Sequence, residues 1–187
     1  MNANILKLIA ICSVMWACSG VRPKPADPRT QLAAQRIIDR GTAALRQGDL
    51  EGAAAAFRVS YDIHENPAAL DGLGAVAYLE QNYSAAERYF IGAYNLDRNY
   101  FEALGNLALL YETMGLTAKA KEIYEFTLKR NPQDIRVRNN FAAFLFDKEL
   151  DGRSRAHVEL AKAEVLASHP LIEYNLNFVE GREYGKE

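Results

Sequence analysis

The 187-residue chain has few cysteines and almost no excess of charge. Its two cysteines, Cys12 and Cys18, both lie near the start, so a scaffold stapled by disulfides is excluded for residues 19–187. A formal net charge of −2 argues against nucleic acid as the main partner, because phosphate binding needs a surplus of Lys and Arg. Apolar residues make up 49% of the chain, which excludes disorder over most of its length. What remains is a compact domain of ordinary size behind an unusual N-terminus.

The sequence also lacks the signatures of enzymes and metal sites. The three histidines, His64, His157 and His169, are isolated, and none belongs to a helix-borne pair of zinc ligands. The segment Gly72-Leu73-Gly74 does not join a strand to a helix, so it is not a phosphate-binding loop, and no serine lies in a nucleophile elbow. We therefore expect no catalytic activity, no cofactor and no bound metal.

The first residues read as an export signal. A single cation, Lys7, is followed by an apolar run from Leu8 to Ala17, whose ten residues are about half of the roughly 20 needed to cross a bilayer. The end of this run, Met15-Trp16-Ala17-Cys18, resembles the lipobox of bacterial lipoproteins. The resemblance implies that residues 1–17 are a lipoprotein signal peptide and that an acylated Cys18 begins the mature chain and anchors it to a membrane.

By the same resemblance, Ser19 after the cysteine favours the outer membrane, with the protein facing the periplasm. The alternative is an ordinary signal peptide or an uncleaved anchor, in which Cys18 is an incidental thiol. Residues 19–30 carry three of the six prolines and no apolar period, which predicts an extended, semi-stiff tether over residues 18–31.

Beyond the tether, four columns of residues recur at steps of 33 or 34 positions, the last unit being slightly longer. The first two columns hold small residues: Gly41, Gly74, Ala108 and Ala142, and then Ala53, Ala86, Ala120 and Ala156. The third column holds large residues, Phe57, Phe90, Tyr124 and Leu160, and the fourth holds small residues or residues with short side chains, Ser60, Ala93, Thr127 and Ala163. Turn signals at Gly48-Asp49, Gln81-Asn82 and Gly115 divide each unit in two, and Pro67, Pro132 and Pro170 separate the units. This pattern predicts pairs of antiparallel helices that cross closely and stack on the next pair.

The pattern resembles the tetratricopeptide repeat (TPR), a helix-turn-helix unit of about 34 residues. Residues 101–134 carry the match best, with Leu104, Leu107, Ala108, Tyr111, Ala120, Tyr124, Thr127 and Pro132. The resemblance implies an all-α TPR solenoid over residues 32–181: units at about 34–66, 67–100, 101–134 and 135–170, a capping helix at 171–181, and a tail at 182–187. The first unit departs from the pattern at Arg40, where an apolar residue is usual.

In TPR proteins the first helix of each unit lines a concave groove that binds peptides or protein surfaces. Carried over to this sequence, those positions and their neighbours give the candidate partner-binding residues Tyr78, Leu79, Asn106, Leu109, Glu112, Arg136, Asn139, Asn140 and Phe146, with Ile38, Thr42 and Leu45 at the same positions of the first unit. Tyr78 and Phe146 are the expected aromatic anchors, and Arg136, Asn139 and Asn106 are expected to orient a peptide backbone or carboxylate. The alternative is that Tyr78, Leu109 and Phe146 pack between hairpins.

A lipobox followed by TPRs resembles the type IV pilus pilotins, which help a secretin assemble in the outer membrane. The function we expect is therefore a membrane-anchored adaptor of the bacterial cell envelope that binds a protein or peptide partner. Two alternatives remain: a scaffold for cell-wall hydrolases, or a soluble periplasmic holdase or co-chaperone with an unmodified Cys18.

Overall fold

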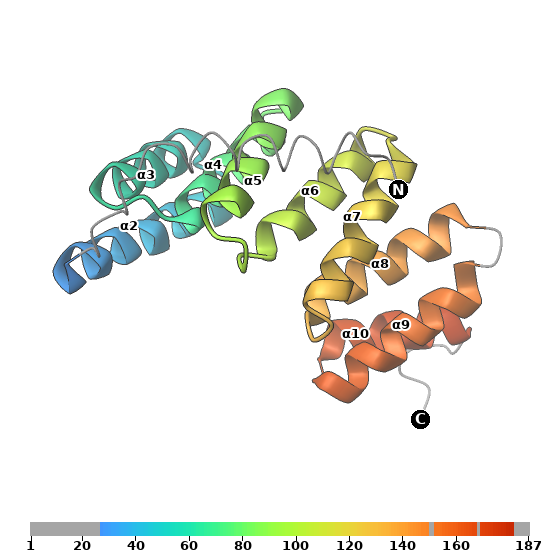
Figure 1. Cartoon of the computed structure of the whole chain (residues 1–187). Helices are drawn as coiled ribbons and strands as arrows, with labels where there is room; N and C mark the ends of the chain where they lie inside the picture. The colour runs from blue at the N-terminus through green and yellow to red at the C-terminus, as the bar shows by residue number, and fades with distance from the viewer. Residues whose placement is uncertain (1–26, 150–151, 168, 182–187) are drawn as a thin grey trace. The chain divides into compact units, whose positions relative to one another are not determined.

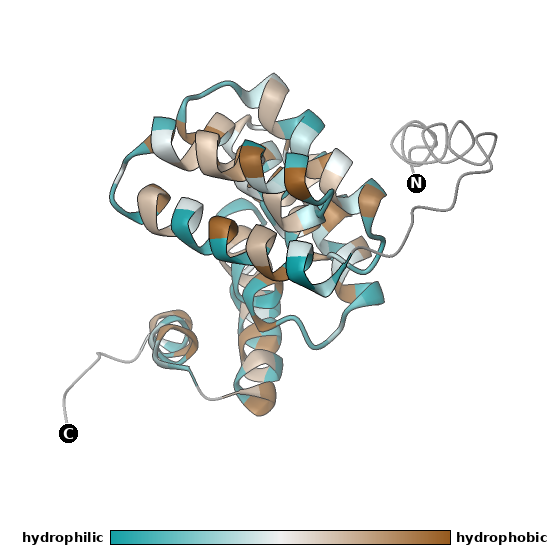
Figure 2. Cartoon of the chain, turned by 90° about the vertical axis from the view of Figure 1, so that its left-hand side faces the viewer, coloured by the Kyte–Doolittle hydropathy of each residue, from teal (hydrophilic) through white to brown (hydrophobic). Residues whose placement is uncertain are grey.

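The computed structural model describes residues 27–149, 152–167 and 169–181. The expected signal peptide, the expected lipidation site Cys18, most of the expected tether and the tail lie outside these residues. Among the described helices, none is both long enough and apolar enough to cross a membrane. Apolar and polar residues alternate along the helices (Figure 2), as expected for elements with one buried side.

The described residues form helices and no strands, which confirms the all-α prediction (Figure 1). The chain divides into two compact units, residues 1–103 and 104–187. Helices of the first unit are α2 (Pro28–Arg46), α3 (Leu50–Ile63), α4 (Pro67–Leu79) and α5 (Tyr83–Leu96). The boundary falls within α6 (Glu102–Thr113), and the second unit continues with α7 (Thr117–Arg130), α8 (Ile135–Lys148), α9 (Gly152–Leu166) and α10 (Pro170–Glu180).

Short polar side chains fix where the helices begin. Asp49 accepts a hydrogen bond from the backbone N–H of Gly52 at 2.9 Å, and Asn66 accepts one from that of Ala69 at 2.8 Å. Such N-caps satisfy donors that have no partner within the helix. Asp27 caps α2 in the same way, so this helix begins at Pro28, whereas the sequence predicted a tether up to residue 31.

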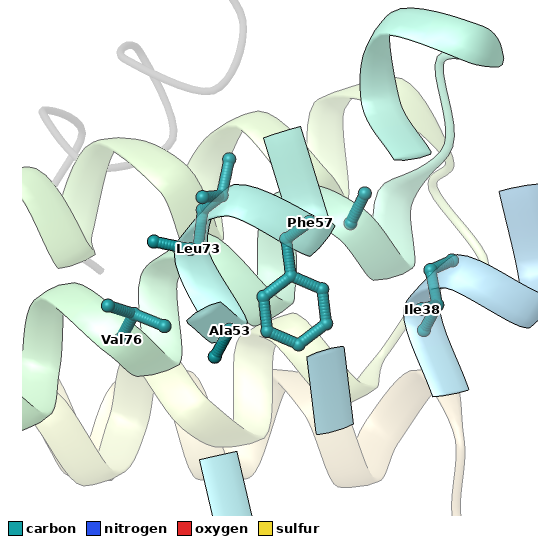
Figure 3. Packing of buried hydrophobic residues seen from close by; sticks show 7 residues of the cluster. Ile38, Ala53, Phe57, Leu73 and Val76 are labelled. Atoms are coloured by element: carbon teal, nitrogen blue, oxygen red, sulfur yellow. The ribbon is translucent and has the colours of Figure 1, made fainter. Parts of the chain in front are cut away.

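The repeat columns form the core, because all sixteen column residues are buried. In the first unit, Phe57 packs with Ile38, Ala53, Leu73 and Val76 (Figure 3). The ring needs glycine beside it: a Cβ added to Gly41 of α2 would lie 2.9 Å from the ring, and one added to Gly72 of α4 would lie 2.6 Å away. Phe57 therefore joins the first hairpin to the second.

Ile38 corrects one expectation. Its repeat position assigned it to the groove with Thr42 and Leu45, but it is only 8% exposed and belongs to the core cluster around Phe57. The reason is the burial of this side of α2 against α3 and α4, which leaves Ile38 little free surface.

The core of the second unit is aromatic. The ring of Tyr124 lies 5.4 Å from that of Phe141 and 5.7 Å from that of Phe144, as centroid distances. The longer last hairpin is held at Gly152, where an added Cβ would lie 1.8 Å from the backbone oxygen of Leu145. Only glycine allows α9 to start so close to α8, and α10 then packs against both of these helices.

Candidate functional site

In the second unit, α8 and α10 enclose two hollows, and the surface that contains them is called here the α8–α10 face. The first hollow has a volume of about 280 Å³ and is lined by Ile135, Arg136, Asn139, Asn140, His169, Leu171 and Ile172. The second measures about 150 Å³ and is lined by Ala142, Ala143, Phe146, Leu160, Asn175, Phe178 and Val179. The two hollows follow one another along the same pair of helices.

The first hollow is polar at its rim. Asn139 accepts a hydrogen bond from the side-chain amide of Asn175 at 2.8 Å, which joins α8 to α10. His169 caps α10 by accepting the backbone N–H of Leu171 at its Nδ1 at 3.2 Å, so its other ring nitrogen carries the proton as a donor. Arg136 and Asn140 line the same space, and none of the described residues that line it carries a carboxylate. The rim is thus suited to acceptor groups of a ligand.

The second hollow is aromatic. The rings of Phe146 and Phe178 lie 5.5 Å apart between centroids and are tilted by 59°. The guanidinium of Arg153 lies 5.7 Å from the centroid of the Phe146 ring, close enough for a cation–π contact. Phe146 therefore contacts α10 of its own chain and, through the hollow, remains partly accessible.

An exposed apolar row on α10 was missed by the sequence analysis. Leu171 is 51% exposed, Tyr174 50% and Phe178 58%. Their spacing places them on one side of the helix. Each follows a residue of α8 by 35 positions: Leu171 and Tyr174 follow the predicted groove residues Arg136 and Asn139, and Phe178 follows Ala143, which lines the second hollow. This spacing of 35 residues could have revealed the exposed row. The fourth unit is longer than the others, however, so its register was not followed into residues 171–181, which were predicted only as a capping helix.

Of the predicted site residues, Arg136, Asn139, Asn140 and Phe146 are brought together on the α8–α10 face. Tyr78 and Leu79 belong to the first unit, where Leu79 is 51% exposed and the Tyr78 ring lies 6.1 Å from that of Tyr83. Neither lines a hollow on the α8–α10 face. Their binding of a partner, like that of the other candidates, stays a prediction.

The candidates on α6 are Asn106, Leu109 and Glu112. Leu109 is 38% exposed, so it is not packed away between hairpins. Glu112 accepts a hydrogen bond from the Tyr124 hydroxyl at 3.2 Å. Burial raises the pKa of Glu112 above its ordinary value, although the Tyr124 hydrogen bond and Lys148 oppose the shift. This carboxylate is therefore a structural partner of the core ring Tyr124 as well as a groove candidate.

Within the part of the chain that the structure describes, no group of three or more His, Cys, Asp or Glu side chains is placed to hold a metal ion.

Comparison with solved structures decides the fold. The chain superposes on a thermophilic TPR protein of Thermus thermophilus with a TM-score of 0.66 and 16% identity, covering 78% of this chain and 80% of that one. It has the TPR fold. PilF of Pseudomonas aeruginosa gives a TM-score of 0.67 at 18% identity, over 80% of this chain and 68% of PilF. A Thermobaculum terrenum O-GlcNAc transferase gives 0.63 at 19%, over 75% of this chain but only 27% of the transferase.

At these identities the likeness establishes the TPR fold alone. No family model and no curated protein matches the sequence. The column residues, the buried large residue of each hairpin and the turns at Gly48, Gln81 and Gly115 are thus explained by a TPR array that ends in the single helix α10.

Proposed function

We propose that this chain is a non-catalytic adaptor that binds a protein partner on the α8–α10 face. The observation that carries the proposal is the exposed row of Leu171, Tyr174 and Phe178 beside the two hollows. Large apolar side chains left half exposed in a row are typical of surfaces that bind other proteins. Completing the burial of one such side chain would stabilise a complex by about 1 kcal/mol.

The shape of the face favours a helix or an extended segment as the bound element. The face runs along two neighbouring helices, with polar donors at the end near Arg136 and His169 and aromatic rings at the end near Phe146 and Phe178. A partner segment with an apolar side and a polar or acidic end would match both parts. Asn106, Leu109 and Glu112 of α6 would add to the groove in the same unit.

We further propose that the adaptor is attached to the outer membrane by a lipid on Cys18 and assists assembly of an envelope complex such as a pilus secretin. The lipobox resemblance supports the anchor, and the fold likeness to PilF supports the comparison with pilotins. A scaffold for cell-wall hydrolases is the second adaptor role, and a soluble periplasmic holdase is the competing function. A holdase would bind many unfolded chains through the same apolar row, whereas an adaptor would bind one partner with a defined interface.

The test compares surface variants of the full-length chain in its native membranes. A chain carrying both Leu171→Ala and Phe178→Ala is expected to lose most of the partner that cross-links to the wild type. The matched control is Val165→Ala on α9, because Val165 is 88% exposed and lines neither hollow. Melting temperatures of all three chains check the fold. Equal capture by the double variant and the wild type would refute the proposed face.

A further inference from the structure

We propose that the first hairpin carries a self-association face, on which a second copy of this chain docks. This inference goes beyond the adaptor role and concerns the other compact unit. The face is a hollow of about 400 Å³ between α2 and α3, and its lining within the described residues belongs to the first hairpin. Small residues of α3 form one side, namely Gly52, Ala55 and Ala56, and Val59 stands beside them, 48% exposed.

The repeat register shows what this face does elsewhere in the chain. Gly41 and Gly74 are equivalent and lie 33 positions apart, so Ile37, Arg40 and Ala56 correspond to Leu70, Leu73 and Tyr89 of the second hairpin. In the second hairpin these three side chains pack against the cluster around Phe57, and Leu73 is only 6% exposed. The same surface is therefore a stacking interface in the second hairpin and an open hollow in the first.

The first hairpin carries small and larger side chains next to one another in the hollow. Val59, which is 48% exposed, lines it together with Ala55 and Ala56, whereas the Asp49 carboxylate fills the space beside Gly52. In a two-fold pair, the same patch is used on both copies, so each Val59 would enter the hollow of the other copy. The same surface thus supplies both the side chain that inserts, Val59, and the hollow that receives it.

The charges of the hairpin also favour a second copy. Helix α2 carries four arginines against one aspartate, whereas α3 with its cap carries three acids against one arginine: Arg29, Arg36, Arg40, Arg46 and Asp39; Asp49, Glu51, Asp62 and Arg58. A two-fold axis parallel to the helices places α2 of one copy over α3 of the other, where unlike charges meet. Arg40 and Asp49 both line the hollow and would lie nearest to this contact.

The experiment places a photoreactive amino acid at Ala55 in the full-length chain, with isotopically light and heavy copies mixed in one membrane or detergent sample. We expect a product of doubled mass that joins light to heavy peptides of the first hairpin. The same probe at Ala118 of α7, also exposed, is the position control and should give no such product. The cross-link at Ala55 is read by mass spectrometry.

Charge reversal then tests the geometry. Arg40→Glu should reduce the doubled product by about tenfold or more, because each change in a two-fold interface counts twice. Lys129→Glu, a charge reversal at an exposed residue of α7 in the other compact unit, should leave it within about twofold. Far-UV circular dichroism checks that both variants fold. Ala55→Glu is a second disrupting variant, and it is tested with the photoreactive amino acid placed at a neighbouring position. Single-copy products, adducts that map to residues 1–26 of the same chain, or adducts to another protein would each overturn the inference.

Discussion

At each hairpin crossing of this TPR array, one small residue and one large residue share a single space. Gly74 and Phe90 show how tightly they share it, since a Cβ on Gly74 would lie 2.5 Å from the Phe90 ring. The fourth unit fills the same two columns differently, with Ala142 and Leu160, both buried. The third unit pairs Ala108 with the larger Tyr124, both buried, so the size of the large residue does not by itself decide between glycine and alanine in the small column.

Gly74→Ala should destabilise the protein by about 1–2 kcal/mol. Overpacking costs about 1–3 kcal/mol, and the better helix propensity of alanine offsets about 0.5–1 kcal/mol of it. In a Phe90→Leu background the same substitution should cost clearly less, because the smaller side chain leaves room for the methyl group. Urea unfolding of the four chains in a double-mutant cycle measures this coupling, and additive effects would contradict it.

Glu112 should make stability fall as the pH rises. Its pKa is raised mainly by burial, so the folded state holds the proton at pH values where the unfolded state has released it. Stability is then highest below the ordinary pKa of the carboxyl and declines as the pH passes through the raised pKa. Glu112→Gln should remove this part of the pH dependence and raise the melting temperature at neutral pH.

The glutamine can still accept the Tyr124 hydroxyl, so loss of that hydrogen bond does not complicate the comparison. Melting curves of both chains between pH 4 and 8 give the readout. Parallel pH profiles would show that burial of Glu112 does not govern its protonation.

At the scale of the element, the turns of the first three hairpins adopt one backbone conformation with two kinds of residue. Gly48 and Gly115 have φ values of 78° and 71°, and Gln81 has a φ of 60°. This left-handed region suits glycine, whereas a residue with a Cβ is strained there by about 1–2 kcal/mol. The turn of the second hairpin thus stores strain that the other two avoid.

Gln81→Gly should stabilise the protein by about 0.5–1 kcal/mol, because the relief of strain exceeds the extra entropy that glycine has in the unfolded chain. Gly48→Ala should do the opposite and destabilise by about 1 kcal/mol, and nothing within 4 Å of its Cβ position adds a steric term. Thermal unfolding of both variants tests the pair, and a destabilised Gln81→Gly chain would contradict the strain.

The elements were largely predictable from sequence because columns and turns follow local rules. Gly48-Asp49 and Gln81-Asn82 predicted turns, and both pairs form them. The prediction failed at Ile38, where tertiary contacts decide, because α3 and α4 cover it. The sequence analysis made no prediction for Gly152, which lets α9 start against the backbone of Leu145. The site was predicted only in part, because α10 adds its own groove row out of register with the earlier units.

At the scale of the whole molecule, the proposed anchor determines where the TPR array can act. Two acyl chains or more hold a protein stably on a bilayer, whereas an unmodified chain would diffuse away. The segment before α2 contains both Cys18 and the single tryptophan, Trp16, on either side of the proposed cleavage point. Processing therefore changes the chemistry of the chain in two measurable ways.

Wild-type cells fed labelled palmitate should yield a labelled protein in the membrane fraction, and Cys18→Ala should lose both the label and the membrane association. The mature wild-type protein should also lack tryptophan fluorescence, because Trp16 is removed with the signal peptide. An unlabelled wild-type protein would exclude the anchor and favour a soluble periplasmic role.

The packing of the Phe57 ring between α2 and α4 has a consequence for the dynamics of the chain. Its ring touches the backbone of α2 at Gly41 and of α4 at Gly72, so the ring can turn over only when these two helices move apart. The flipping rate of this one ring, measured from nuclear magnetic resonance line shapes, would therefore report how often the first two hairpins move apart.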